Sequence, residues 1–319
     1  MSKLAFLFPG QASQYPGMGR NLADSFPECK NVFNEADTAL GFSISKLCFE
    51  GSEEELKLTE NTQPSILTVS VAAYRILEKR GMAPDFVAGH SLGEYSGLVA
   101  SGALDFATGV KLVRKRGRYM QEAVPSGEGA MAAIMGLSPS DVGEICKKAS
   151  NGEVVSPANL NSPEQTVISG AAAAVKRAVE IASQSGAKRA VILAVSAPFH
   201  CSLMAPAQTR LEPELREAAF GALKFPLVTN VDAGAITSGE EARNALIRQV
   251  TMPVRWLDSV HEMIESGVTI FVEVGPGKVL SGLLRQIDRS VRCFNVEDAA
   301  SLQSTLEKIA QARAEVPEV

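Results

Sequence analysis

The chain has 319 residues, of which 45% are hydrophobic, and a formal net charge of -5. Its length predicts either two domains or one large domain with an insertion, and its composition is sufficient for a buried core. The acidic balance argues against a nucleic-acid-binding protein, which usually presents a basic face, so we expect no nucleic-acid partner.

The cysteines and the N-terminus indicate the compartment in which the protein works. Five cysteines occur without a C-x-x-C pair, and this pattern fits a reducing compartment better than a disulfide scaffold. The apolar run at residues 4–8 is too short for a signal peptide. No stretch approaches the ~18 consecutive apolar residues of a membrane span. We therefore expect a soluble, cytoplasmic protein with no membrane partner.

Strand-like and helix-like segments alternate along most of the chain. Strands are predicted at residues 4–8, 86–88 and 270–274, and a predicted helix at residues 66–80 ends before Gly81. Such alternation is typical of a mainly parallel sheet that is covered by helices. The predicted fold class is therefore α/β.

The middle of the chain follows a different order. Its segments read strand, helix, strand, strand, helix, strand, at residues 130–135, 139–149, 154–157, 166–169, 171–184 and 190–195. This βαββαβ order is that of a ferredoxin-like unit. We therefore predict an inserted ferredoxin-like subdomain at residues 127–196, within a large domain formed by residues 1–126 and 197–319.

The segment Gly89-His90-Ser91-Leu92-Gly93 follows a predicted strand and precedes a helix-forming stretch. This is the G-x-S-x-G pattern of a nucleophile elbow, in which the glycines permit a tight turn that exposes the serine. The N–H groups at the start of the next helix would point toward an oxyanion formed at Ser91. A glycine-rich turn without catalytic function gives the same pattern, so the motif alone is a hypothesis.

A serine nucleophile needs a base, and the chain has only three histidines. His90 is adjacent to Ser91, and neighbouring side chains on a strand point to opposite faces. His261 lies among polar neighbours beside an apolar stripe, which indicates a surface position. His200 remains as the candidate base, with a loop histidine that caps backbone groups as the alternative. No acidic third member is marked by its spacing, and a carbonyl group is able to orient the imidazole instead.

One arginine lies on the apolar face of a predicted helix at residues 109–120. Val113, Arg116 and Met120 share one stripe by their spacing. A guanidinium that points inward keeps its charge and needs a partner. The partner is either a buried structural carboxylate or the anion of a ligand, and the sequence leaves both open.

Beyond the elbow, the chain resembles the bacterial malonyl-CoA:acyl carrier protein transacylases over its full length. The resemblance is carried by seven separated motifs, at residues 8–14, 89–94, 113–117, 158–163, 197–200, 249–256 and 273–277. It implies an α/β-hydrolase-like large domain with a ferredoxin-like insertion, in agreement with the order of segments given above. It also implies that malonyl-CoA and acyl carrier protein are the partners.

The resemblance further implies a ping-pong reaction through a malonyl ester of Ser91, with His200 as the base. Gln249 would orient His200 through its main-chain carbonyl, and the N–H groups of Gln11 and Leu92 would hold the oxyanion. The remaining implied contacts with the substrate are made by Arg116, which would bind the malonyl carboxylate, and by His90 and Asn159. No cofactor is implied, because CoA and phosphopantetheine thioesters are substrates.

Two other functions use the same features. A serine thioesterase or other hydrolase would employ the same Ser91 and His200 and differ only in admitting water to the acyl ester. A noncatalytic module that docks acyl carrier protein would not need Ser91 at all, and it accounts poorly for an elbow, a base and an inward cation together.

Overall fold

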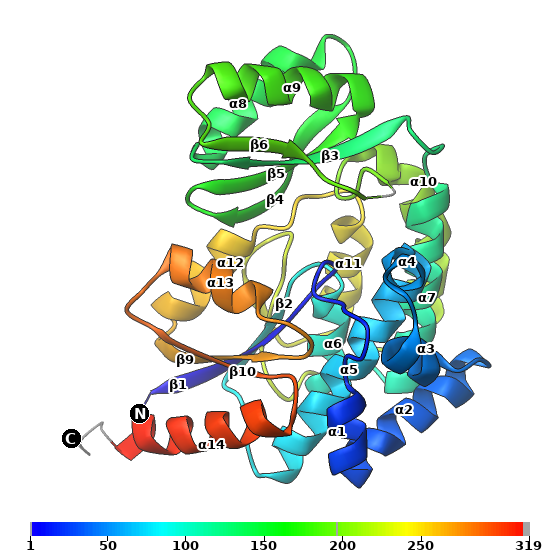
Figure 1. The fold of residues 1–319 in the computed structure, drawn as a ribbon, viewed down its shortest axis with the longest axis vertical. Helices are drawn as coiled ribbons and strands as arrows, with labels where there is room; N and C mark the ends of the chain where they lie inside the picture. The colour runs from blue at the N-terminus through cyan, green and yellow to red at the C-terminus, as the bar shows by residue number, and fades with distance from the viewer. Residues whose placement is uncertain (1, 196, 315–319) are drawn as a thin grey trace.

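The computed structural model describes residues 2–195 and 197–314 and contains two separate sheets (Figure 1). The larger sheet has six strands in the order β10-β9-β1-β2-β7-β8, and its pairs are parallel except for β7 with β8. Its strands are β1 (Lys3–Phe8), β2 (Phe86–Gly89), β7 (Leu227–Val228), β8 (Ala235–Ile236), β9 (Val268–Val274) and β10 (Arg292–Val296).

Helices cover both faces of this sheet, as the alternation along β1 shows. Leu4, Phe6 and Phe8 join one hydrophobic core with α5, α6 and α7, whereas Ala5 and Leu7 join a second core under α12 and α13. The helices of the large unit are α1 (Arg20–Ser25), α2 (Pro27–Leu40), α3 (Ile44–Glu50), α4 (Glu53–Lys57), α5 (Thr59–Lys79), α6 (Gly93–Ala100), α7 (Phe106–Glu122), α10 (Ala205–Glu217), α11 (Gly239–Gln249), α12 (Trp256–Glu265), α13 (Val279–Ile287) and α14 (Ala299–Ala314).

The smaller sheet is antiparallel, has the order β4-β5-β3-β6, and lies at the top of Figure 1. Two helices pack on one face of it and enclose their own core. Its elements in chain order are β3 (Gly129–Met135), α8 (Pro139–Ser150), β4 (Val155–Ser162), β5 (Gln165–Ala171), α9 (Ala172–Gln184) and β6 (Arg189–Ile192). This βαββαβ order, beside a mainly parallel sheet, confirms the predicted fold class. The predicted last residue of the inserted subdomain, residue 196, lies outside the described residues.

Several predicted element bounds were wrong. The helix predicted at residues 66–80 is α5, which already starts at Thr59. Its first turns bury polar side chains and lack an apolar stripe, so the sequence pattern did not mark them as helix. The strand predicted at residues 154–157 continues to Ser162 through two bulges opposite β5. The strand predicted at residues 190–195 ends at Ile192. Among the described residues, no helix has both the length and the apolar character required to cross a bilayer.

The turn between β2 and α6 depends on its two glycines. Ser91 has φ +50°, a left-handed conformation that is uncommon outside glycine. A Cβ on Gly89 would lie 1.9 Å from the carbonyl carbon of Gly93, and a Cβ on Gly93 would lie 2.0 Å from the carbonyl oxygen of Phe8. Only glycine therefore permits the sheet and the helix to approach so closely at this point.

We predict that Gly93→Ala destabilises the protein by about 3 kcal/mol or more, because its methyl group would meet backbone atoms that cannot move aside. Gly143→Ala is the matched control, since it lies inside helix α8 and, apart from its chain neighbours and the backbone of its own helix, no atom lies within 4 Å of the added Cβ. It should be neutral or stabilise by about 0.5–1 kcal/mol. Urea unfolding measures both, and equal free energies of unfolding for wild type and Gly93→Ala would contradict the packing argument.

Candidate active site

Ser91 lies at the tip of the elbow and is fixed there by a residue that follows the neighbouring strand β7. Asn230, which follows β7, accepts a hydrogen bond from the Ser91 N–H at 2.7 Å and donates one to the Gly89 carbonyl at 2.7 Å. Its side chain is fully buried. The amide of Asn230 therefore bonds both sides of the turn and helps to hold the strained backbone of Ser91.

His200 lies in the loop between β6 and α10, and its ring reaches the elbow. Its Nε2 is 2.7 Å from the Ser91 Oγ, and its Nδ1 is 2.9 Å from the main-chain carbonyl oxygen of Gln249. Because a carbonyl oxygen only accepts, Nδ1 carries the proton, and Nε2 is free to accept the proton of the serine hydroxyl.

The surroundings of His200 keep its imidazole neutral. Burial, followed by the nearby Arg116 guanidinium, lowers its pKa to about 3. The ring is only 4% exposed. At neutral pH the imidazole is therefore unprotonated, which is the form that a general base requires.

Arg116, on α7, is 1% exposed and points to the nucleophile. Its Nη1 donates to Gln63 Oε1 at 2.8 Å, and its Nη2 donates to Gln249 Oε1 at 3.0 Å and to Ser91 Oγ at 3.0 Å. Within residues 2–195 and 197–314, no carboxylate forms an ion pair with this guanidinium, and its Nε has no hydrogen-bond partner. Of the two partners that the sequence left open, no structural carboxylate contacts Arg116 within the described chain, and Glu94 interacts with it electrostatically from beyond ion-pair distance.

Gln249, the last residue of α11, joins these groups through its side chain as well as its carbonyl. Its Nε2 donates to the Ser91 carbonyl at 3.0 Å and to the carboxylate of Glu94 through a short contact. Glu94 is itself buried in α6, and burial raises its pKa to about 8. The amide of Gln249 is therefore oriented with its oxygen toward Arg116 and its nitrogen toward Glu94.

Ser91, His200 and Arg116 line one cavity of about 340 Å³ between the two sheets. Gln11, His90 and Asn159 also line it, whereas Leu92 and Gln249 are not among its lining residues. The rest of the lining is largely apolar and includes Met120, Met131, Met135, Leu193, Val279 and Leu283. An apolar cavity with a few convergent polar groups is the usual form of a small-molecule site.

Two main-chain N–H groups beside the elbow are available for an oxyanion. In the part of the chain that the structure describes, the N–H groups of Gln11 and Leu92 donate to no protein atom. The side chain of Gln11 is turned to Thr59 Oγ1, at 3.3 Å. Leu92 immediately precedes α6, whose N-terminus adds favourable electrostatics for an anion.

His90 and Asn159 hold the small sheet against the elbow. The Nε2 of His90 is 2.9 Å from Oδ1 of Asn161, and its ring packs on Trp256. Asn159 forms an isolated parallel bridge with Val254, which joins β4 to the segment before α12. Both residues line the cavity, and their contacts with Asn161, Trp256 and Val254 join segments of the protein to one another. His261, by contrast, is exposed, as the sequence predicted.

Sequence reasoning missed four buried polar residues of the site: Gln63, Glu94, Asn161 and Asn230. Gln63 lies in a run of buried polar side chains at the start of α5, and this departure from the apolar pattern was the available signal. Glu94 was quoted within the elbow motif, but no role was given to it. Asn161 lies within the motif at residues 158–163, but no role in the site was given to it. Asn230 lies far along the chain from Ser91, and no local pattern marks it.

Comparison with known proteins identifies the family. Residues 5–311 match the acyl transferase domain. A malonyl CoA-acyl carrier protein transacylase of Bacillus subtilis is 47% identical over 310 residues, which cover 97% of this chain and 98% of the relative.

Comparison with solved structures gives the same family. The malonyl CoA-acyl carrier protein transacylase of Clostridium perfringens is 44% identical and superposes with a TM-score of 0.95, with 98% and 99% of the two chains covered. A malonyl-transacylase solved in complex with a type II PKS acyl-carrier protein is 46% identical, with a TM-score of 0.94 and coverage of 96% and 100%. The chain therefore belongs to the acyl transferase domain family, among the malonyl CoA-acyl carrier protein transacylases.

Proposed function

We propose that this protein transfers the malonyl group of malonyl-CoA to the phosphopantetheine thiol of acyl carrier protein, through a malonyl ester of Ser91. The observation that carries the proposal is the buried guanidinium of Arg116, which lies 3.0 Å from the nucleophile and has no carboxylate partner in the described chain. An acyl group that ends in a carboxylate supplies that partner in the same cavity.

In the first half-reaction, the Ser91 Oγ attacks the thioester carbonyl while His200 Nε2 accepts its proton. The carbonyl oxygen becomes an oxyanion, which the N–H groups of Gln11 and Leu92 stabilise, each by about 3 kcal/mol. The intermediate collapses, the C–S bond breaks, and His200 returns its proton to the departing CoA thiolate. The products are CoA and malonyl-Ser91.

In the second half-reaction, the phosphopantetheine thiol takes the place of CoA. His200 accepts the thiol proton as sulfur attacks the ester, and the same oxyanion site is used again. His200 then protonates Ser91 Oγ as the ester bond breaks. The carbonyl of Gln249 keeps the imidazole in the required tautomer in both halves, so the mechanism needs no acidic third residue.

The protein's own side chains and main-chain N–H groups supply every proton transfer and charge contact in this scheme, so the proposal includes no cofactor. We propose a cytoplasmic location, which suits the five cysteines, all of them free thiols. Acyl carrier protein is the proposed partner, since a close relative was solved in complex with such a protein. The product would supply malonyl units to fatty acid chain elongation.

We predict that the malonyl-enzyme is stable in buffer and passes its label to acyl carrier protein. Enzyme labelled briefly with radioactive malonyl-CoA, then freed of thiols, should retain its label until holo-acyl carrier protein is added. Ser91→Ala should take up no label. Rapid release of free malonate without any thiol would instead identify a thioesterase.

We predict that Arg116→Ala loses malonyl transfer by about 100-fold or more, because the substrate carboxylate would be buried without its cation. Acetyl transfer should persist or improve. Arg114→Ala is the control, since this neighbouring arginine bonds Glu60 and Asn61 rather than the cavity. Steady-state rates with both CoA esters measure the ratio, and equal losses of malonyl and acetyl transfer would show that Arg116 is purely structural.

The depressed pKa of His200 predicts a shifted pH profile. As the pH falls through that pKa, the imidazole becomes protonated and no longer acts as a base, so the acidic limb of kcat/KM for acetyl-CoA should lie well below pH 6.5. Arg116→Ala removes one cause of the depression, and its limb should move upward. A wild-type inflection near pH 6.5 would contradict the neutral, buried imidazole.

A further inference from the structure

The loop that carries the Gln11 N–H is strained. Ala12 has φ +82°, which costs a non-glycine residue free energy and persists only where the surroundings enforce it. Two local hydrogen bonds contribute: Ser13 Oγ donates to the Gly10 carbonyl at 2.7 Å, and the Ala12 N–H donates to Gln14 Oε1 at 2.8 Å. Both lie within the loop, so they do not fix it relative to the cavity.

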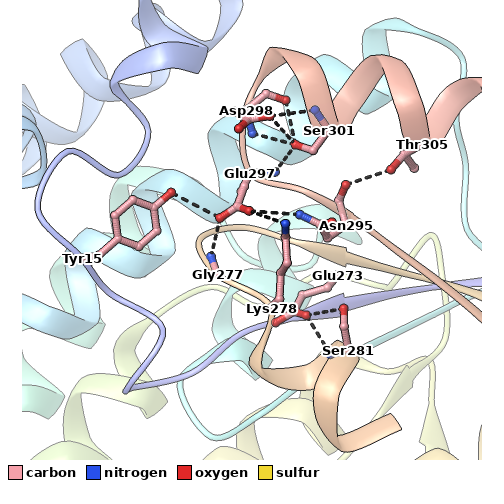
Figure 2. Close-up of polar contacts among 10 residues, drawn as sticks. All are labelled: Tyr15, Glu273, Gly277, Lys278, Ser281, Asn295, Glu297, Asp298, Ser301 and Thr305. Atoms are coloured by element: carbon pink, nitrogen blue, oxygen red, sulfur yellow. Dashed lines mark hydrogen bonds and ion pairs between the residues drawn. The ribbon is translucent and has the colours of Figure 1, made fainter. Parts of the chain in front are cut away.

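Besides the Gln11 side chain, which bonds Thr59 on α5, a contact with the far end of the chain provides that connection. Tyr15 Oη donates to Glu297 Oε2 at 3.3 Å, across 282 positions of sequence, as Figure 2 shows. Glu297 follows β10, and its N–H donates to Ser301 Oγ at the start of α14. Its side chain is only 15% exposed. The loop is thus tied to a carboxylate that is itself anchored in the large sheet.

The same carboxylate holds a second wall of the cavity. Glu297 Oε2 also accepts from the Gly277 N–H at 3.0 Å, and its Oε1 lies 3.4 Å from Lys278 Nζ and 3.3 Å from Asn295 Nδ2 (Figure 2). Gly277 and Lys278 lead directly into α13, whose residues Val279, Leu280 and Leu283 line the cavity.

The two segments also touch directly. A Cβ on Gly277 would lie 3.3 Å from the Ser13 carbonyl oxygen, and a Cβ on Gly275 would lie 2.9 Å from the ring of Pro9. The turn at residues 275–278 therefore packs on the loop that contains Gln11, and Glu297 bonds both of them.

We propose that Glu297, with Tyr15, is a positioning residue that fixes the Gln11 N–H for the oxyanion. This inference rests on the proposed function, in which that N–H stabilises the transition state of both half-reactions. Glu297 does not touch the substrate. It acts by holding the strained loop at the distance from Ser91 that the oxyanion requires.

Tyr15→Phe and Glu297→Gln test the proposal with little change of shape. The first removes the donor of the contact, and the second removes the charge and replaces one of the two acceptor oxygens, both of which face donors, by an NH2 group. Single-turnover acylation of Ser91 at saturating CoA ester should slow by about 10-fold in each, because a displaced oxyanion donor loses part of its effect. The KM should hardly change. The malonyl and acetyl rates should fall by the same factor, because the oxyanion is common to both. The double variant should be no slower than the slower single variant, since both break one contact.

Tyr74→Phe and Glu78→Gln are the matched controls. Tyr74 Oη donates to Glu78 Oε1 at 3.1 Å, Glu78 also pairs with an arginine, and neither residue lines the cavity. These variants should acylate at the wild-type rate when all are assayed well below their unfolding temperatures.

Two outcomes would overturn the positioning role of Glu297. One is acylation by Tyr15→Phe and Glu297→Gln at the wild-type rate, and the other is a loss that affects only malonyl-CoA or only the KM. Both leave the proposed function intact, provided that the wild type forms malonyl-Ser91. Failure of the wild type to form that ester would instead refute the proposed function itself.

Discussion

A charged guanidinium buried against a serine hydroxyl is the constraint on which the rest of the site depends. Arg116 receives only neutral acceptors from the described chain, the amide oxygens of Gln63 and Gln249 and the Ser91 hydroxyl. Neutral acceptors compensate poorly for the hydration that a buried cation loses. A substrate carboxylate would neutralise this charge. In the proposed reaction the substrate therefore supplies the anion that pairs with Arg116.

The fold brings this cation, the nucleophile and the base together from separate parts of the chain. The parallel sheet delivers Ser91 on the turn after β2, α7 supplies Arg116, and the chain leaving the small sheet supplies His200. Gln249 connects all three, because its carbonyl orients His200 while its side chain bonds Arg116 and the Ser91 carbonyl. A displacement of α11 would therefore disturb the base and the cation together, and also the Ser91–Leu92 peptide, which carries one of the two oxyanion donors.

Local rules in the sequence were sufficient for the strands β1, β2 and β9, the elbow and the inward arginine, because each follows from spacing within about ten residues. The strands β7, β8 and β10 of the same sheet were not predicted. The start of α5 was missed, since its first turns bury polar side chains that break the apolar pattern. Gln63 and Asn230 were missed because they bond Arg116 and Ser91 across 53 and 139 positions. Such pairings depend on how the helices pack, which no single segment encodes.

The central claim is that one buried cation selects the acyl group that Ser91 accepts. Brief incubation of the wild type with equal concentrations of malonyl-CoA and acetyl-CoA, followed by mass spectrometry of the intact protein and its peptides, tests this directly. If the buried cation makes this selection, the peptide that contains Ser91 should carry a malonyl adduct, with little acetyl adduct. A predominance of acetyl, or an adduct on another residue, would contradict it.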